Sequence, residues 1–186
     1  MAVIEIAMRR LLYISFIFFL GCRPISTSHV DFSSSLLIDS VDITTFNTDS
    51  MKNQIFNKDD KLVQLDKPDI LICEKLLKDY IYQYNLDGAR KIDSLKRYFR
   101  DVRHIIAQIY EEQFHIDLSK YGRQYIAVLN KQNHKIVYIN CFCNPSEHDY
   151  KRKDWVFVMD GGNCFFQMKI DLTVKKVIEY SENGVA

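Results

Sequence analysis

The spacing of apolar residues changes once along the chain, and this change constrains the fold more than any other feature. From about residue 66 to residue 113 the apolar residues recur every three or four positions, and from about residue 124 they recur every second position. The first spacing is typical of an amphipathic helix and the second of a strand with one buried face. Helices followed by strands predict an α+β domain, with two to three helices packed on a four- to five-stranded antiparallel meander sheet.

Two helices are expected before the strands. The first starts at the capping residue Asp66, with a proline in its first turn, and is expected to end near Asn85 or Gly88. The second covers residues 90–113, either whole or broken in two. Apolar stripes at helical spacing are usually core, so we expect these to be buried: Cys73, Leu76, Leu77, Tyr80, Ile81 and Tyr84 in the first helix, and Ile92, Leu95, Tyr98, Phe99, Val102, Ile105, Ile106, Ile109 and Tyr110 in the second.

The strands follow from period-two spacing and from turn residues. Residues 124–129 and 135–142 read as two strands joined by a short polar loop. Gly161-Gly162 separates two further runs rich in β-branched and aromatic residues, and a Gly-Gly pair supplies the positive φ angles of a two-residue hairpin turn. A last turn at 173–176 returns the chain into a final strand. This helix-on-sheet arrangement is similar to cystatin-like folds.

A hairpin at Gly161-Gly162 would set the pairing of its two strands. It predicts three facing pairs: Met159 with Cys164, Phe157 with Phe166, and Trp155 with Met168. The apolar row on the second of these strands is expected to face the core: Phe166, Met168, Ile170 and Leu172.

The amino terminus has the parts of a secretory signal peptide. Arg9-Arg10 precedes an apolar run over residues 11–20, and the small residue Gly21 follows it. The run is too short to span a bilayer comfortably. Met8 is an alternative start, because the residues before it add nothing to this pattern.

The segment Phe19-Leu20-Gly21-Cys22 resembles the lipobox of bacterial lipoproteins, with Phe where that family usually has Leu. The resemblance implies that residues 1–21 are removed and that Cys22 carries acyl chains. These chains would anchor the protein to the inner or outer membrane of a bacterial cell envelope, with its domain outside the cytoplasm. An ordinary signal peptide with an incidental cysteine, or a single membrane anchor, is the alternative.

We expect a flexible tether over residues 22–60 and one globular domain over residues 61–186. The first segment is rich in Ser, Thr, Asn and Asp, as spacers are. Apolar residues such as Ile43 and Phe46 also allow a short edge strand or a packed arm within it. A chain of 186 residues with 47% hydrophobic residues is long enough for one domain with a substantial core.

Four further cysteines follow Cys22: Cys73, Cys141, Cys143 and Cys164. In an exported protein such a set permits disulfides. Cys141 and Cys143 share a face of one predicted strand, and Cys164 lies on a strand that can neighbour theirs. A bridge from Cys164 to one of that pair is one interpretation, and free buried thiols are another. A zinc site from these three with His148 is a third, although the Cys-x-x-Cys spacing is missing.

Other chemistry has no recognisable signature in the sequence. It contains no Gly-x-Ser-x-Gly elbow, Walker loop, dinucleotide fingerprint or His-Glu-x-x-His motif, and its five histidines are scattered. We therefore predict no catalytic residue, no metal site, no cofactor and no enzymatic activity. A formal net charge of +1 argues against a nucleic-acid partner.

The carboxy-terminal part contains four short motifs: Tyr121-Gly122-Arg123-Gln124-Tyr125, Ile139-Asn140-Cys141-Phe142, Asp160-Gly161-Gly162-Asn163-Cys164-Phe165-Phe166 and Asn183-Gly184-Val185-Ala186. Together these motifs resemble a group of small uncharacterised lipoproteins from Bacteroidota. The resemblance covers about the last 65 residues and, separately, the lipobox-like segment that ends at Cys22. It implies a location and a domain type, and it brings no activity, ligand or site residue with it.

Three functional hypotheses follow. The leading one is a lipid-anchored, non-enzymatic module of the cell envelope, which binds another protein or an envelope component. The second is an immunity or inhibitor lipoprotein that protects its host from a toxin. The third is a hydrolase or metal-dependent enzyme built on the region of Cys141, Cys143, Cys164 and His148.

Overall fold

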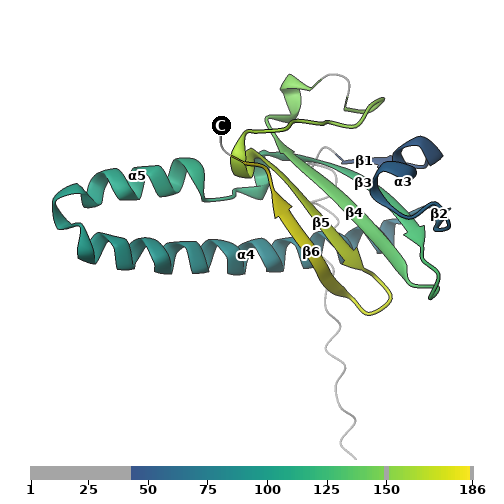
Figure 1. The fold of residues 1–186 in the computed structure, drawn as a ribbon, viewed down its shortest axis with the longest axis horizontal. Coiled ribbons are helices and arrows are strands. Elements are labelled where there is room, and N and C mark those ends of the chain that lie inside the picture. Colours follow the sequence, from purple (N-terminus) through teal and green to yellow (C-terminus); the bar gives the residue numbers. More distant parts are fainter. Residues whose placement is uncertain (1–42, 149–150, 185–186) are drawn as a thin grey trace, which may run out of the picture. The chain divides into compact units, whose positions relative to one another are not determined.

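The computed structural model describes residues 43–148 and 151–184, with the backbone alone described at 110–113. All of these residues belong to one compact unit, Ser34–Ala186. The unit is an α+β domain with three helices and a six-stranded, mostly antiparallel sheet, and a helix packs on the sheet (Figure 1). The predicted fold class is therefore confirmed. The predicted signal peptide and Cys22 lie outside the described residues.

Four strands form the predicted antiparallel meander. They are β3 (Tyr121–Leu129), β4 (Lys135–Cys143), β5 (Phe165–Asp171) and β6 (Lys176–Glu182), and they lie side by side in chain order. The two strands predicted from period-two spacing are thus β3 and β4, each slightly longer than expected. The turn after β5 also lies where the sequence indicated.

The free edge of β3 is occupied by a part of the chain that the sequence indicated as tether. β1 (Ile43–Phe46) pairs parallel to the first half of β3, and β2 (Lys61–Val63) pairs antiparallel to its second half. α3 (Asp49–Ile55) connects the two. Residues 43–60 therefore belong to the folded domain, because their backbone and apolar side chains complete the sheet edge.

The long helix α4 (Lys67–Tyr98) begins as predicted. Asp66 is its N-cap and forms a capping box with Asp69, so two backbone N–H groups of the first turn are satisfied. The helix does not end near Asn85 or Gly88 as predicted. The Asn85 side chain bonds to the backbone of Ile116 through both its nitrogen (2.8 Å) and its oxygen (3.0 Å), so it does not compete for the helix backbone.

The second predicted helix is broken in two. Its first part is the end of α4, and its second part is α5 (Arg103–Gln113). Between them, Phe99 leaves helical geometry and a 3₁₀ turn, η1 (Arg100–Val102), reverses the chain. α4 and α5 thus form a helical hairpin (Figure 1).

The core lies between α4 and one face of the sheet. Cys73, Leu77 and Ile81 of α4 are buried there, and so is the predicted apolar row of β5 and the residue after it: Phe166 (0% exposed), Met168 (1%), Ile170 (0%) and Leu172 (8%). Because strand side chains alternate, the other residues of β3, β4 and β5 point to the opposite face. We call this opposite face the outer face.

The predicted hairpin at Gly161-Gly162 is wrong. Both glycines have positive φ, as a turn requires, but the chain leaves them as a 3₁₀ turn, η4 (Gly162–Cys164), and residues 155–160 form no strand. Met168 pairs with Ile139 of β4 on one side and with Tyr180 of β6 on the other. With both edges of β5 occupied, Trp155 cannot pair with Met168.

Candidate binding pocket

A row of polar side chains crosses the outer face of the sheet. Gln124 of β3 pairs in register with Asn140 of β4, which pairs with Gln167 of β5, which pairs with Ser181 of β6. Neighbouring side chains in this row are hydrogen-bonded: the Asn140 amide donates to Gln124 (3.1 Å) and the Ser181 hydroxyl donates to Gln167 (3.2 Å). Four strands therefore present one continuous line of hydrogen-bonding groups.

Residues 151–160 lie over this row, and we call them the cover segment. Gln124, which is fully buried, donates from Nε2 to the carbonyls of Lys151 (2.7 Å) and Asp154 (2.8 Å) and accepts at Oε1 from the Val156 N–H (2.8 Å). Asn140, 2% exposed, donates to the Val156 carbonyl at 2.7 Å. Side chains thus supply the bonds that strand pairing would otherwise supply.

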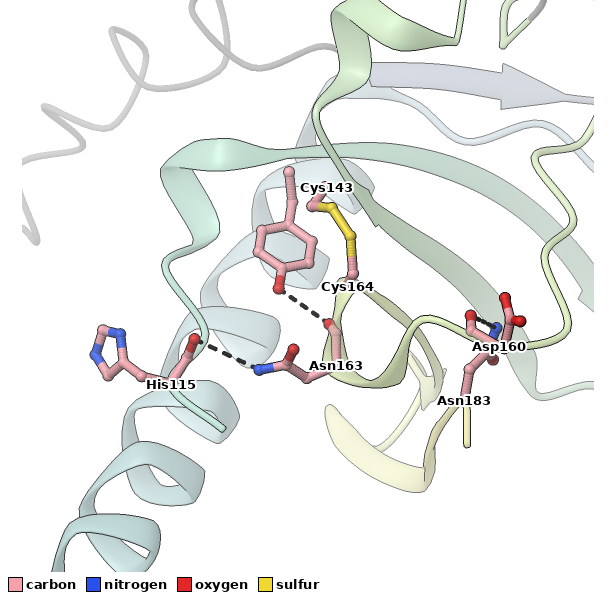
Figure 2. Close-up of a disulfide and its surroundings, with 7 residues drawn as sticks. His115, Cys143, Asp160, Asn163, Cys164 and Asn183 are labelled. Atoms are coloured by element: carbon pink, nitrogen blue, oxygen red, sulfur yellow. Dashed lines mark hydrogen bonds between the residues drawn. A yellow bond between two sulfur atoms is a disulfide. The ribbon is translucent and has the colours of Figure 1, made fainter. Parts of the chain in front are cut away.

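The far end of the cover segment is held by Asn183, just beyond β6. Its Nδ2 donates to the carbonyls of Val158 and Asp160, the latter at 3.2 Å (Figure 2). Between the two ends, Trp155 packs against Phe46 and Tyr138, with ring centroids 5.7 Å apart in both cases. The segment is therefore fastened by amides and by one indole ring.

A pocket of about 140 Å³ remains between the cover segment and the outer face. Aromatic, aliphatic and amide side chains line it: Tyr138, Asn140, Trp155, Val156, Phe157, Val158, Phe165, Gln167 and Asn183. None of these side chains is an acid, an amine, an imidazole or a thiol. Burial raises the pKa of Tyr138 to about 12, so its phenol stays neutral at physiological pH.

One amide in this pocket has hydrogen-bonding capacity in reserve. Gln167 Nε2 reaches Asn140 Oδ1 at 3.5 Å and Asn183 Oδ1 at 3.4 Å, both at the outer limit for a hydrogen bond. A ligand oxygen placed in the pocket could accept a shorter bond from this nitrogen. The arrangement suits recognition of a neutral polar group between aromatic walls.

A disulfide joins Cys143 to Cys164 at the end of the pocket's two central strands, with Cα atoms 5.0 Å apart. It continues the β4–β5 ladder beyond the pair Phe142 and Phe165. The interpretation that Cys164 is bridged to one of two candidate cysteines thus agrees with the structure. Disulfides persist in oxidising compartments, so this bond suggests a domain that works outside the cytoplasm.

Hydrogen bonds next to the disulfide also join distant parts of the chain. Tyr121 donates its hydroxyl to the Asn163 carbonyl at 2.9 Å, and the Asn163 side chain donates to the His115 carbonyl at 3.5 Å (Figure 2). These bonds link the turn before β5 to the start of β3 and to the segment after α5.

The cysteines and histidine of the alternative zinc or nucleophile site do not converge. Cys143 and Cys164 are consumed by the disulfide. Cys141 faces the core, and burial raises its pKa to about 12, while the His148 ring packs edge-on against Phe142, a residue of the outer face. Among the described residues, no group of three or more His, Cys, Asp and Glu side chains could hold a metal ion. The remaining thiol, Cys73, is buried and its pKa is raised by burial.

A buried charged cluster on the core side was not foreseen from the sequence. Arg123, 3% exposed, lies 3.1 Å from Glu74 of α4 and donates to the Tyr121 and Leu118 carbonyls at 2.9 and 3.0 Å. Tyr125 donates to the same glutamate. This cluster joins helix to sheet, and Arg123 Nε, although 3.1 Å from the Glu74 carboxylate, makes no hydrogen bond among the described residues.

The amides of the pocket were also missed. Asn140 and Gln167 each interrupt an apolar run within a predicted strand, and Gln124 is the first residue of one. This was the available signal. Only the strand register places them side by side.

The described residues contain no helix that is both long enough and apolar enough to cross a membrane.

Comparisons with known proteins returned no relative. No family model matches the chain, and neither a curated protein nor a solved structure matches it. The likeness to lipoproteins of Bacteroidota therefore stays a prediction from sequence motifs.

Proposed function

We propose that this protein is a lipid-anchored, non-enzymatic binding protein of the bacterial cell envelope, and that its pocket takes a neutral saccharide group of an envelope glycan. The observation that carries this proposal is the pocket on the outer face, which combines aromatic walls with amides. Aromatic rings pack against the apolar face of a sugar ring, and amides bond to hydroxyl or acetamido groups. The lining carries no charge that would select an ionised ligand.

The size of the pocket limits what it can hold. Pockets that enclose a whole small molecule measure roughly 300–1,000 Å³, and this one measures about 140 Å³. It suits one substituent or one edge of a sugar unit, with the rest of a polymer lying outside. Binding at the end or side of a glycan chain fits that geometry better than engulfment of a metabolite.

The absence of reactive groups from the lining supports binding over catalysis. General acid and base work needs a titratable side chain near the reacting atoms, and among the nine lining residues only Tyr138 titrates, far above neutral pH. The amides and the indole are groups that recognise ligands without transforming them.

The location rests on two independent features. Cys22 lies in a segment that resembles a lipobox and would carry the acyl anchor. The Cys143–Cys164 disulfide suits an oxidising compartment. A glycan ligand of the envelope would be available to a domain in that place.

To test the pocket, a soluble N-acetylglucosamine trimer is titrated into the protein, and nuclear magnetic resonance chemical shifts report its binding. We expect shifts at Phe157, Phe165 and Gln167 that saturate with probe concentration. Phe157→Ala should weaken binding at least fivefold, because Phe157 lines the pocket while being 75% exposed, so its loss does not open the core. Met159→Ala is the matched control, since Met159 is 84% exposed in the same segment and does not line the pocket.

Equal binding by both variants would place the saccharide elsewhere, and no shifts with the trimer or with a peptide-linked glycan fragment would refute the glycan proposal. The anchor is tested separately. Labelled palmitate should be incorporated by the native chain and not by Cys22→Ser, and equal labelling of the two would refute lipidation at Cys22.

A further inference from the structure

The helical hairpin exposes apolar side chains that the sequence indicated as core. In the half of α4 that lies on the sheet, Cys73, Leu77 and Ile81 are at most 2% exposed. Beyond the sheet α4 continues alongside α5, which is its main neighbour among the described elements (Figure 1). There six residues of the predicted stripe are open to solvent, whereas Ile92 is buried and Ile106 is half-buried. The six are Leu95 (42% exposed), Tyr98 (85%), Phe99 (55%), Val102 (41%), Ile105 (45%) and Ile109 (40%).

Four of these six apolar residues lie at the turn between α4 and α5. Tyr98 and Phe99 stand where α4 ends, Val102 belongs to η1, and Ile105 lies in the first turn of α5. We call residues 90–109 the hairpin tip. A contiguous group of large exposed apolar side chains usually marks a surface that contacts something else.

The hairpin tip is also strongly basic. Residues 90–103 contain six Lys and Arg residues against two Asp residues, a net charge of +4, whereas the whole chain has +1. Arg90 and Lys96 have acidic partners, Asp87 (2.9 Å) and Asp93 (3.8 Å). The other four cations are exposed and form no salt bridge with the side chains described in 43–109, 114–148 and 151–184: Lys91, Arg97, Arg100 and Arg103.

Charge decides between the surfaces that could cover the tip. A second copy would bring two tips of +4 together, and like charges at close range repel. An anionic bilayer attracts the same charges, while aromatic and aliphatic side chains enter the boundary between headgroups and acyl chains. Basic residues interleaved with exposed Tyr, Phe, Leu and Ile fit that surface on both counts.

We propose that the hairpin tip docks on the surface of an anionic lipid bilayer. Tyr98, Phe99 and Val102 enter the headgroup region, and Lys91, Arg97, Arg100 and Arg103 face the lipid phosphates. In the cell this contact rests on the proposed anchor at Cys22, which brings a membrane within reach. The tip would then set which side of the domain faces the membrane and which side carries the pocket away from it.

The experiment uses the full chain with Cys22→Ser, so that no acyl chain contributes, and reads a local probe. Tyr98→Trp adds an indole at an 85% exposed position, and the emission of the same chain without this change, due to Trp155, is subtracted. With vesicles of phosphatidylglycerol and phosphatidylcholine (1:3) we expect a blue shift of about 10 nm or more and quenching by brominated acyl chains. Pure phosphatidylcholine vesicles should give less than a quarter of that response.

A charge variant and its matched control complete the test. Arg97→Glu with Arg100→Glu should abolish the blue shift. Lys175→Glu with Lys176→Glu reverses the same number of exposed charges at the end of the β5–β6 turn and the start of β6, and it should leave the blue shift intact. An unshifted probe on anionic vesicles, or equal shifts in both charge variants, would overturn the proposal.

A shift that grows with protein concentration in the absence of vesicles would also overturn it, in favour of a second copy as the occupant. Because the probe reports only from position 98 and the chain is not acylated, this outcome is independent of the palmitate test at Cys22. A protein could therefore fail one test and pass the other.

Discussion

The Gln124 side chain on β3 holds the backbone of Val156 in the cover segment, with its Oε1 accepting from the Val156 N–H at 2.8 Å. The same amide donates to the Lys151 and Asp154 carbonyls. One buried side chain therefore satisfies three backbone groups that lie against the sheet. For the cover segment, the hydrogen bonds of Gln124 take the place of the backbone bonds that hold a strand in a sheet.

Replacing Gln124 with leucine should release the cover segment. The variant keeps the volume but leaves buried backbone groups unpaired, so we expect the free energy of unfolding to fall by about 2–4 kcal/mol. Trypsin should also cut faster after Lys151, Arg152 or Lys153. Urea denaturation and timed proteolysis measure both effects, with Gln132→Leu in the exposed β3–β4 turn as the control. Unchanged cleavage rates in Gln124→Leu would contradict the role assigned to this amide.

Removing the disulfide should destabilise the domain without unfolding it. Cys143 and Cys164 are 21 positions apart, and a crosslink closing a loop of that length contributes about 3 kcal/mol through the entropy of the unfolded chain. The double variant Cys143→Ala, Cys164→Ala should lose about that amount in urea denaturation. Added reductant should lower the native protein to the same stability and leave the double variant unaffected. If reductant left the urea denaturation curve of the native protein unchanged, the disulfide would not form in that protein.

A methyl group at Gly122 should be costly although the backbone there is ordinary. A Cβ at this position would lie 2.5 Å from the Phe142 ring and 2.9 Å from Pro145. Because the Phe142 ring is buried and cannot swing away, Gly122→Ala should lower stability by about 1–3 kcal/mol. Gly184→Ala is the control, since a Cβ there meets nothing within 4 Å. Thermal unfolding compares the two, and adding Phe142→Leu to Gly122→Ala should recover part of the loss.

Acid should weaken the turn after β5 through Asp171. Burial acts to raise the pKa of Asp171, but bonds from His134 (2.6 Å) and from the Val174 and Thr173 N–H groups outweigh it, and the pKa lies below its ordinary value of 3.8. A depressed carboxyl pKa contributes stability that is present above the unfolded value of about 3.8 and is lost as pH falls through the lower folded value. Urea denaturation between pH 5 and pH 2 should therefore show a smaller decline for Asp171→Asn than for the native chain. Parallel curves for the two would contradict the linkage.

Much of the fold was accessible to sequence reasoning where local spacing decides the outcome. The cap at Asp66 and the alternation through Phe166, Met168 and Ile170 were predicted, and the structure confirms both. These features depend on residues within a few positions of one another. The end of α4 was placed too early, because Asn85 is a helix breaker only when its amide is free, and Ile116 occupies it.

The candidate site was less accessible. Gln124, Asn140 and Gln167 are each unremarkable polar residues in a strand, and they form a row only because β3, β4 and β5 pair in one particular register. Gly161-Gly162 was identified as a turn and has the positive φ angles expected. The neighbour of β5 could not be predicted from that turn, since several strands competed for the same edge.

The sequence by itself determined where the long helix begins and which residues of β5 face the core. It also offered Cys141 or Cys143 as a bridge partner of Cys164, with free thiols and a zinc site as alternatives. Each of these follows from periodicity or capping, which act over short stretches of chain. Only the tertiary structure decided that Cys143 is that partner, that residues 155–160 are held by side-chain amides, and that the apolar stripe of Tyr98 and Phe99 faces solvent. The reason is physical, because strand pairing and burial depend on which distant segments occupy a shared edge or face. Where a helix extends beyond its sheet, apolar residues at the same helical spacing are exposed instead of buried.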